Sequence, residues 1–172
     1  MKHLALLALI LSLSFCKSVK IEETIVHQNE SQEQGYTIQE KMEIIPRQMI
    51  HFAKDEAGVE YLKLLPGEHT VFKYKYRKFP KDTSLKDAVY TQYIYFEMPG
   101  KIKDTELKND ELKSVNLTAQ VFAFRNATLH RIDKGSLKIK VIDKQHIEVE
   151  INLDDSYKTL QKKHIKQLIN IK

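Results

Sequence analysis

The clearest pattern in this chain is an alternation of apolar and polar residues in its C-terminal half. Across residues 115–129 the odd-numbered positions are apolar except at Arg125, and the same rule holds for residues 137–141 and 147–153. Successive side chains of a β-strand point to opposite faces, so this period predicts strands with one buried face. We therefore expect a long strand at residues 115–129, followed by a hairpin of two shorter strands.

The same alternation predicts how the two strands of the hairpin pair. A three-residue turn at residues 143–145 would place Val141 opposite Ile147 on the apolar face. It would also place Lys140 opposite Glu148 on the polar face, and opposite charges across strands add about 0.2–1 kcal/mol per pair. A two-residue turn would move the apolar face of one strand to water. The three-residue turn is therefore the predicted register, which continues with Ile139 opposite Val149, Leu137 opposite Ile151 and Lys138 opposite Glu150.

Period two also appears in the N-terminal half of the chain. A half-buried strand is predicted from Tyr36 to Ile44, and Pro46 is expected to end it because proline cannot donate a ladder hydrogen bond. Pro66-Gly67 is typical of a turn. Further strands are expected at residues 47–53, 59–65, 69–78 and 88–98, and residues 99–114 are expected to form a loop or a short surface helix.

A different spacing marks the C-terminus. A spacing of three to four positions recurs there, at Tyr157, Leu160, His164, Ile165, Leu168 and Ile169, between several lysines. Asp154, Asp155 and Ser156 stand before them, and such residues cap the first turn of a helix. The segment is therefore predicted to be an amphipathic helix.

These elements predict a mainly β protein. Strands follow one another without alternating helices, which favours an antiparallel meander over a parallel sheet. A meander of about eight strands either closes into a barrel or splits into two packed sheets. With its C-terminal helix, the plan resembles that of the lipocalins and calycins, although the Gly-x-Trp signature of lipocalins is absent because the chain has no tryptophan. Barrel and two-sheet sandwich both remain open at this point.

The first residues have the layout of a secretory signal. Lys2 is followed by an apolar run over residues 4–13, with Ser12 and Ser14 as small residues near its end. The run is shorter than the ~20 apolar residues that span a bilayer. We expect residues 1–15 to be a signal peptide that exports the chain.

The end of this leader, Leu13-Ser14-Phe15-Cys16, resembles the lipobox of bacterial lipoprotein precursors. It departs from that pattern at Phe15, where a small residue is usual. The resemblance implies that Cys16 is acylated, that residues 16–35 form a lipid-anchored N-terminus and polar tether, and that a single β-rich domain follows at residues 36–172. Cys16 is the only cysteine, and an odd cysteine in an exported chain needs an explanation. The alternative is an ordinary signal-peptidase cut after Ser14, which would leave a periplasmic or secreted protein.

Charge and motifs exclude several functions. The net charge of +5 comes from 28 basic and 23 acidic residues that are interspersed, which is no nucleic-acid signature. The chain has no nucleophile elbow, phosphate-binding loop or paired carboxylate motif. The expectation is therefore a protein without catalytic residues, without a cofactor and without nucleic acid as a partner.

Aromatic residues gather in two neighbouring strands. Phe72, Tyr74 and Tyr76 alternate with Lys73, Lys75 and Arg77, and the next strand is aromatic on both faces. One interpretation is a pocket for a small apolar ligand, backed by a strip that binds polyanions. The other is an ordinary core with solvated charges on its far side. The candidate pocket residues are Phe72, Tyr74, Tyr76, Tyr90, Tyr93 and Tyr95.

Two further sets of residues are candidates for function. Phe122 and Phe124 lie opposite the apolar row of their strand, where either the C-terminal helix covers them or a partner protein docks. His146, Glu148 and Glu150 share one strand face and are a candidate metal site. The alternative for the glutamates is pairing with Lys138 and Lys140, which would compete with a metal ion.

The sequence thus predicts a lipid-anchored cell-envelope protein that binds a small apolar ligand or a partner without catalysis. The second hypothesis is a structural or assembly factor that docks on another envelope protein. An open cavity lined by Tyr74, Tyr93 and Tyr95 would favour ligand binding. A filled core beside an exposed apolar patch would favour docking.

Overall fold

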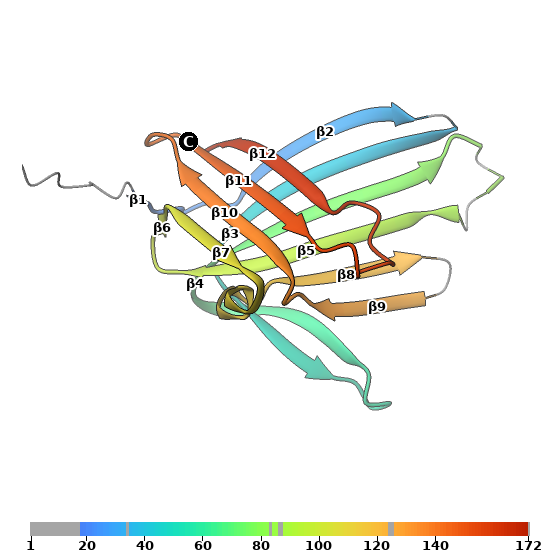
Figure 1. Cartoon of the computed structure of the whole chain (residues 1–172), viewed down its shortest axis with the longest axis horizontal. Coiled ribbons are helices and arrows are strands. Elements are labelled where there is room, and N and C mark those ends of the chain that lie inside the picture. Colours follow the sequence, from blue (N-terminus) through green and yellow to red (C-terminus); the bar gives the residue numbers. More distant parts are fainter. Residues whose placement is uncertain (1–17, 34, 83, 86–87, 124–125, 172) are drawn as a thin grey trace, which may run out of the picture.

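A computed structural model describes residues 18–171 apart from residues 34, 83, 86–87 and 124–125. The described residues form two main antiparallel sheets that pack face to face, together with a small two-stranded sheet (Figure 1). Within this part of the chain neither main sheet closes on itself, and each keeps two edge strands. Of the two architectures that the sequence allowed, the two-sheet sandwich is confirmed and the lipocalin-like barrel is wrong.

The larger sheet has six strands in the order β2-β3-β4-β5-β8-β9. Their bounds are β2 Ile25–Glu33, β3 Tyr36–Lys54, β4 Glu60–Pro80, β5 Tyr90–Pro99, β8 Thr118–Ala123 and β9 Asn126–Arg131. The smaller sheet has the order β12-β11-β10-β7, with β12 His164–Asn170, β11 His146–Leu153, β10 Gly135–Val141 and β7 Thr105–Lys108. β1 Ser18–Val19 pairs with β6 Ile102–Lys103, and a 3₁₀ helix, η2, spans Asn109–Val115.

The core lies between the two sheets. Phe72 of β4 and Phe96 of β5 are fully buried and stack with their ring centroids 4.4 Å apart. From the smaller sheet, alternate residues of β10 and β11 face them, among them Ile139 and Val149. This alternation is what the period-two pattern predicted.

The β10–β11 register is the one that the sequence predicted. Val141 lies opposite Ile147 and Lys140 opposite Glu148, and the pairing continues to Leu137 opposite Ile151. The prediction succeeds because a shift by one residue would bring charged side chains into the core.

β3 and β4 form one long hairpin rather than four short strands. Pairing runs from Tyr36 opposite Pro80 to Pro46 opposite Thr70, then shifts so that Gln48 lies opposite Pro66. Arg47, at the shift, has a φ of 56°, which marks a bulge. Pro46 therefore does not end the strand, and Pro66-Gly67 does not form a hairpin turn. The distal half of the hairpin, residues 48–66, which we call the arm, bends away from the sheet (teal and green at the bottom of Figure 1).

Two other predicted segments differ in the structure. Ile25–Glu33, assigned to the tether, is the edge strand β2 and pairs with β3 along its whole length. The predicted strand at residues 115–129 is instead the end of η2 followed by β8 and β9, which pair with each other. Since Ala123 lies opposite Asn126, the connection moves the odd positions to the other face of the sheet. Val121 is therefore buried, whereas Leu129 lies on the outer face.

The predicted C-terminal helix is wrong. Residues 154–163 form turns, which we call the strap, and the chain then pairs with β11 as strand β12. Ile165 and Ile169 lie four positions apart and also keep the same parity, so they satisfy a strand as well as a helix. In the strand both are buried, and Leu168 is left 61% exposed. The acidic residues form a turn instead of a helix cap, with the Ser156 amide donating to Asp154 Oδ1 at 2.8 Å.

Candidate functional site

The predicted aromatic pocket is divided between the two faces of the larger sheet. Because Tyr74 lies opposite Ile94 and Phe72 opposite Phe96, the even-numbered residues of β4 and β5 share the inner face. Phe72, Tyr74, Tyr76 and Tyr90 belong to the main core on that face. Tyr93 and Tyr95 lie on the outer face and pack in a separate cluster. The six side chains therefore do not line one cavity.

The inner aromatic residues fill the space between the sheets. Tyr74 is 1% exposed, and Tyr76 meets Tyr90 edge to face with ring centroids 6.2 Å apart. Burial, and secondarily the negative charge of Glu40, raise the pKa of Tyr74, so its hydroxyl stays neutral. That hydroxyl is buried without a hydrogen-bond partner among the described residues. The contacts of this region are those of a packed core.

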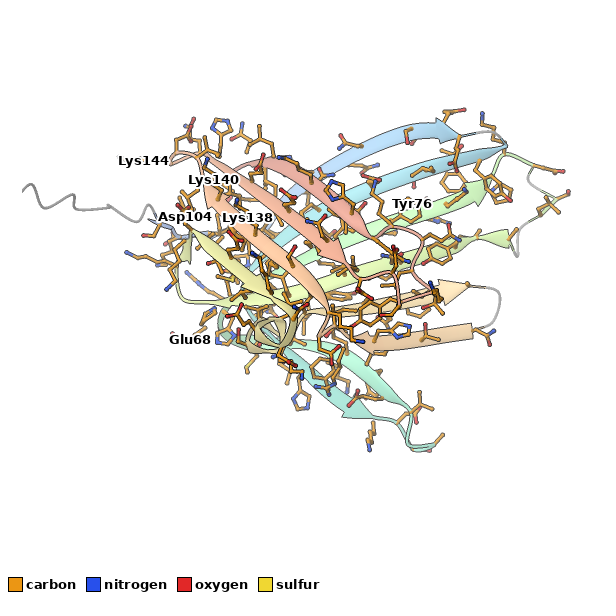
Figure 2. The ribbon with its side chains drawn as sticks, viewed as in Figure 1. Glu68, Tyr76, Asp104, Lys138, Lys140 and Lys144 are labelled. Carbon is orange, nitrogen blue, oxygen red and sulfur yellow. The ribbon has the colours of Figure 1, made fainter. Side chains whose placement is uncertain are left out.

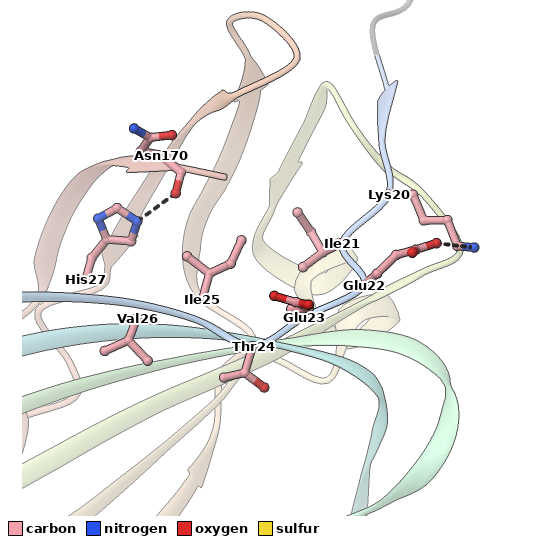
Figure 3. Close-up of a pocket in the computed structure, with 9 residues that line it drawn as sticks. All are labelled: Lys20, Ile21, Glu22, Glu23, Thr24, Ile25, Val26, His27 and Asn170. Carbon is pink, nitrogen blue, oxygen red and sulfur yellow. Dashed lines mark hydrogen bonds and ion pairs between the residues drawn. The ribbon is translucent and has the colours of Figure 1, made fainter. Parts of the chain in front are cut away.

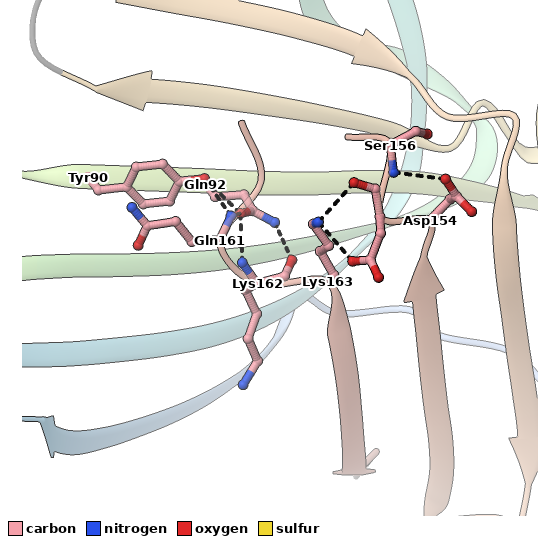
Figure 4. Close-up of polar contacts among 8 residues, drawn as sticks. Tyr90, Gln92, Asp154, Ser156, Gln161, Lys162 and Lys163 are labelled. Atoms are coloured by element: carbon pink, nitrogen blue, oxygen red, sulfur yellow. Dashed lines mark hydrogen bonds and ion pairs between the residues drawn. The ribbon is translucent and has the colours of Figure 1, made fainter. Parts of the chain in front are cut away.

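The strap closes the core beside Tyr90 and Gln92 (Figure 4). Gln92 is fully buried, and its Nε2 donates to the Lys162 carbonyl at 2.6 Å. Its Oε1 accepts from the Gln161 and Lys162 amides, both at 3.1 Å. Leu160 of the strap is 3% exposed and belongs to the core. The strap thus covers the side of the core beside Tyr90 and Gln92.

The outer face of the larger sheet carries a second, smaller core. Ile50 from the arm is buried there together with Val71 and Tyr95, and partly buried apolar residues surround them. These surrounding residues are Ile45, Phe52, Leu62, Leu64 and Tyr93. The arm therefore covers one part of the outer face.

A buried carboxylate holds the base of the arm. Glu97 of β5 is 4% exposed, and its Oε2 accepts from the Ile50 amide at 2.6 Å. Its Oε1 accepts from Asn116 Nδ2 at 2.7 Å. His69 Nδ1 lies 3.3 Å from Glu97 Oε2 but does not form a hydrogen bond with it. Glu97 therefore links β5, the arm and the end of η2.

Three aromatic side chains continue from this small core toward solvent. Tyr95 and Tyr93 stack with centroids 5.9 Å apart, and Tyr93 meets Phe122 edge to face at 6.0 Å. Exposure rises along this aromatic ladder, from 8% at Tyr95 to 41% at Phe122. Desolvation accordingly raises the pKa of Tyr95. The aromatic ladder therefore begins at Tyr95, in the smaller core, and ends at Phe122, which is exposed to solvent.

Basic side chains border the aromatic ladder. Lys73 Nζ lies 5.4 Å and Lys75 Nζ 5.9 Å from the centre of the Tyr93 ring, within the range of a cation–π contact. Arg77 lies beyond Lys75 on the same strand face, with its guanidinium carbon 5.2 Å from the Phe79 ring centre. The aromatic ladder, Lys73, Lys75 and Arg77 together form what we call the outer patch.

The structure describes only part of the predicted partner face. Phe122 lies in the outer patch. The segment predicted as the C-terminal helix contains strand β12, so no helix of the described residues covers Phe122. Phe124 and Cys16 lie outside the described residues. Of the candidate pocket residues, Tyr93 and Tyr95 join Phe122 in this patch.

The metal candidate on β11 does not assemble. His146 Nδ1 lies 3.0 Å from Asp143 Oδ1, and Lys166 Nζ lies 3.3 Å from Glu148 Oε2 and 3.9 Å from Glu150 Oε2. Among residues 18–171 as described, no three histidine, cysteine or acidic side chains come close enough to hold a metal ion. Lys138 and Lys140 lie opposite the glutamates in register and project outward from β10 (Figure 2), but both glutamates form their ion pairs with Lys166.

A hollow lies elsewhere, at the edge of the sandwich. It measures about 900 Å³ and is lined by residues 20–27 together with Asn170 (Figure 3). His27 Nε2 lies 3.2 Å from the Asn170 carbonyl, and Lys20 pairs with Glu22 at 3.0 Å on its rim. This hollow is not predicted from the sequence, because residues 20–27 were assigned to a polar tether.

Comparison of the chain with known protein families, with curated proteins and with solved structures found no match. No helix in the described part of the chain is both long and apolar enough to cross a membrane.

Proposed function

We propose that this chain is a lipid-anchored protein of the bacterial cell envelope that docks on another envelope protein without catalysing a reaction. One observation carries the choice of docking over ligand binding. The aromatic residues of the inner face are buried in a packed core, whereas the aromatic ladder on the outer face ends at Phe122, which is 41% exposed. A filled core beside an uncovered apolar patch is the arrangement expected of a docking protein.

The composition of the outer patch supports this proposal. Protein interfaces are enriched in tyrosine, phenylalanine and arginine, and their strongest contacts are aromatic or arginine side chains near the centre. In the outer patch, Tyr93 and Phe122 form the centre, and Lys73, Lys75 and Arg77 form a charged rim. A partner that covered Phe122 would complete the burial of a cluster that the arm already covers at its other end.

The positions of β1 and β8 are compatible with a lipid anchor on Cys16 and an accessible Phe122. Cys16 lies two residues before Ser18, which begins β1 at the left of Figure 1. Strand β8, which carries Phe122, runs toward the opposite end of the sandwich. A lipid on Cys16 would leave the Phe122 end of the domain facing away from the membrane surface.

The anchor is tested by replacing Cys16. With Cys16→Ser, we expect loss of acyl labelling and a shift of the chain from the detergent phase to the aqueous phase. The reason is that two or three acyl chains bind membranes firmly, with about 0.8 kcal/mol for each buried CH₂ group. The measurements are labelling with a radioactive fatty acid and phase partitioning in a bacterial host. A variant that labels and partitions like the parent would refute the anchor.

Docking is tested by photocrosslinking at Phe122. We expect a chain with p-benzoyl-phenylalanine at position 122 to form one discrete adduct in the cells that make this protein. The matched control carries the same group at Leu168, which is 61% exposed on the smaller sheet. The adduct should be competed by excess unmodified chain but not by a Tyr93→Ala/Phe122→Ala double variant. Equal adducts from positions 122 and 168, or none from either, would contradict docking.

A further inference from the structure

We propose, resting on the docking function above, that the partner presents an acidic extended segment whose carboxylates meet Lys75 and Arg77. The aromatic ladder gives the outer patch its apolar centre, and these two cations give it a preference for one charge. Some cations on the outer face are already neutralised by a neighbouring carboxylate, whereas Lys75 and Arg77 contact aromatic rings.

Glu43 neutralises the cations at one end of the outer patch. Its carboxylate forms ion pairs with Lys41 and with Lys73, the latter at 3.1 Å. Burial alone would raise the pKa of Glu43, but hydrogen bonds from Lys41 and Lys73 outweigh it and lower the pKa. Glu43 is therefore ionised, and each of its two carboxylate oxygens pairs with a lysine. Its ion pairs are with Lys41 and Lys73 and not with the cations farther along β4.

Neither Lys75 nor Arg77 has an acidic residue directly opposite it on either adjacent strand. Lys75 lies opposite Lys41 on β3 and Tyr93 on β5, and Arg77 lies opposite Gln39 and Thr91. Within the described residues, both cations contact aromatic rings and neither forms an ion pair with a carboxylate. A lysine directly opposite another lysine is destabilising. A carboxylate from a partner would relieve that repulsion.

The smaller sheet shows the contrasting arrangement. On its outer face, Lys138 and Lys140 lie opposite Glu150 and Glu148, and Lys166 pairs with both glutamates. Positive and negative side chains therefore alternate across neighbouring strands and balance each other. The unbalanced pair at Lys75 and Arg77 is thus a property of the outer patch and not of every surface of this basic chain.

The spacing of the two cations indicates the shape of the segment. Residues two apart on one strand face lie about 6.6–6.8 Å apart, because a strand rises about 3.3–3.4 Å per residue. Carboxylates two residues apart on an extended partner segment have the same spacing. Arg77 can take one of them through two parallel hydrogen bonds. An adjacent apolar side chain of the partner would then cover Phe122.

The first arm of the test measures binding of labelled poly-L-glutamate to the full-length protein in non-ionic detergent, by fluorescence anisotropy. We expect the Lys75→Glu/Arg77→Glu variant to bind at least about tenfold more weakly than the parent, and added salt to weaken the parent. The matched control is Lys138→Glu/Lys140→Glu, which makes the same charge change at the same spacing on the smaller sheet and should bind like the parent. Equal loss in both variants would overturn the proposal. So would binding of heparin or of phosphatidylglycerol vesicles in preference to polyglutamate.

The second arm separates this inference from docking itself. The position-122 adduct should fall at least about fivefold in the Lys75→Glu/Arg77→Glu background and stay unchanged in the Lys138→Glu/Lys140→Glu background. An adduct that persists in both backgrounds would overturn the acidic partner but leave docking intact. Absence of any adduct in the parent background would instead refute docking.

Discussion

Replacing Phe72 with alanine should lower the free energy of unfolding by about 3–5 kcal/mol, the usual cost of deleting a buried phenylalanine ring. Phe72 is fully buried between the sheets and stacks on Phe96 at 4.4 Å. Its neighbours on both sheets are themselves buried, so little can move into the vacated space. Urea unfolding followed by circular dichroism would measure the loss.

The control for this prediction is Phe122→Ala. Phe122 is 41% exposed, so its truncation should cost less than about 1 kcal/mol. If Phe72→Ala proved as mild as Phe122→Ala, the interior would not be tightly packed. The choice of docking over ligand binding would then lose its main support.

Replacing Glu97 with leucine should cost about 3 kcal/mol, because it leaves buried donors without an acceptor. The Ile50 amide and the Asn116 side chain both donate to this carboxylate, at 2.6 and 2.7 Å. Since Ile50 belongs to the arm, we also expect the arm to loosen on the outer face. Hydrogen exchange at the Ile50 amide should rise by at least about tenfold, a change equivalent to 1.4 kcal/mol.

Two variants bracket this result. Glu97→Gln keeps a carbonyl oxygen for one of the two donors and should therefore cost less than Glu97→Leu. Glu106→Leu changes an exposed carboxylate on β7 and should leave stability and the exchange at Ile50 unchanged. If Glu97→Leu behaved like Glu106→Leu, Glu97 would not be the group that holds the base of the arm.

The sequence predicts pairing well where apolar and charged residues agree on one register. The β10–β11 hairpin is the clearest case, since its core residues and its Lys–Glu pairs select the same turn. The sequence predicts secondary structure poorly where the same residues fit both the helical and the strand period. Ile165 and Ile169 fit both a helix and a strand. They form a strand because their segment pairs with the edge of β11. That edge is a tertiary feature that local spacing does not contain.

The long β3–β4 hairpin was missed for a related reason. Pro46 and Pro66-Gly67 each look like a strand end when taken singly. In the structure they flank a single bulge at Arg47, on opposite strands. Only the pairing of the two strands shows that these breaks coincide, and only the resulting bend shows that the arm covers Tyr95.

The candidate site was predictable in part. The alternation of aromatic and basic residues on β4 identified the right strand, and Phe122 was recognised as facing away from the core. The sequence did not separate Tyr93 and Tyr95 from the inner aromatics, because their face depends on how β5 pairs with β4. Nor did it show that no acidic residue lies directly opposite Lys75 or Arg77, since the opposite residues come from β3 and β5.

The most direct test of docking through the outer patch is the accessibility of position 122 in intact cells. Phe122→Cys and Leu168→Cys would each be labelled with a membrane-impermeant maleimide, in cells with a permeabilised outer layer and in purified protein, after subtraction of the signal from the parent chain. We expect position 122 to be protected in cells but labelled in purified protein, and position 168 to be labelled in both. Equal labelling of position 122 in cells and in purified protein would contradict docking at this face.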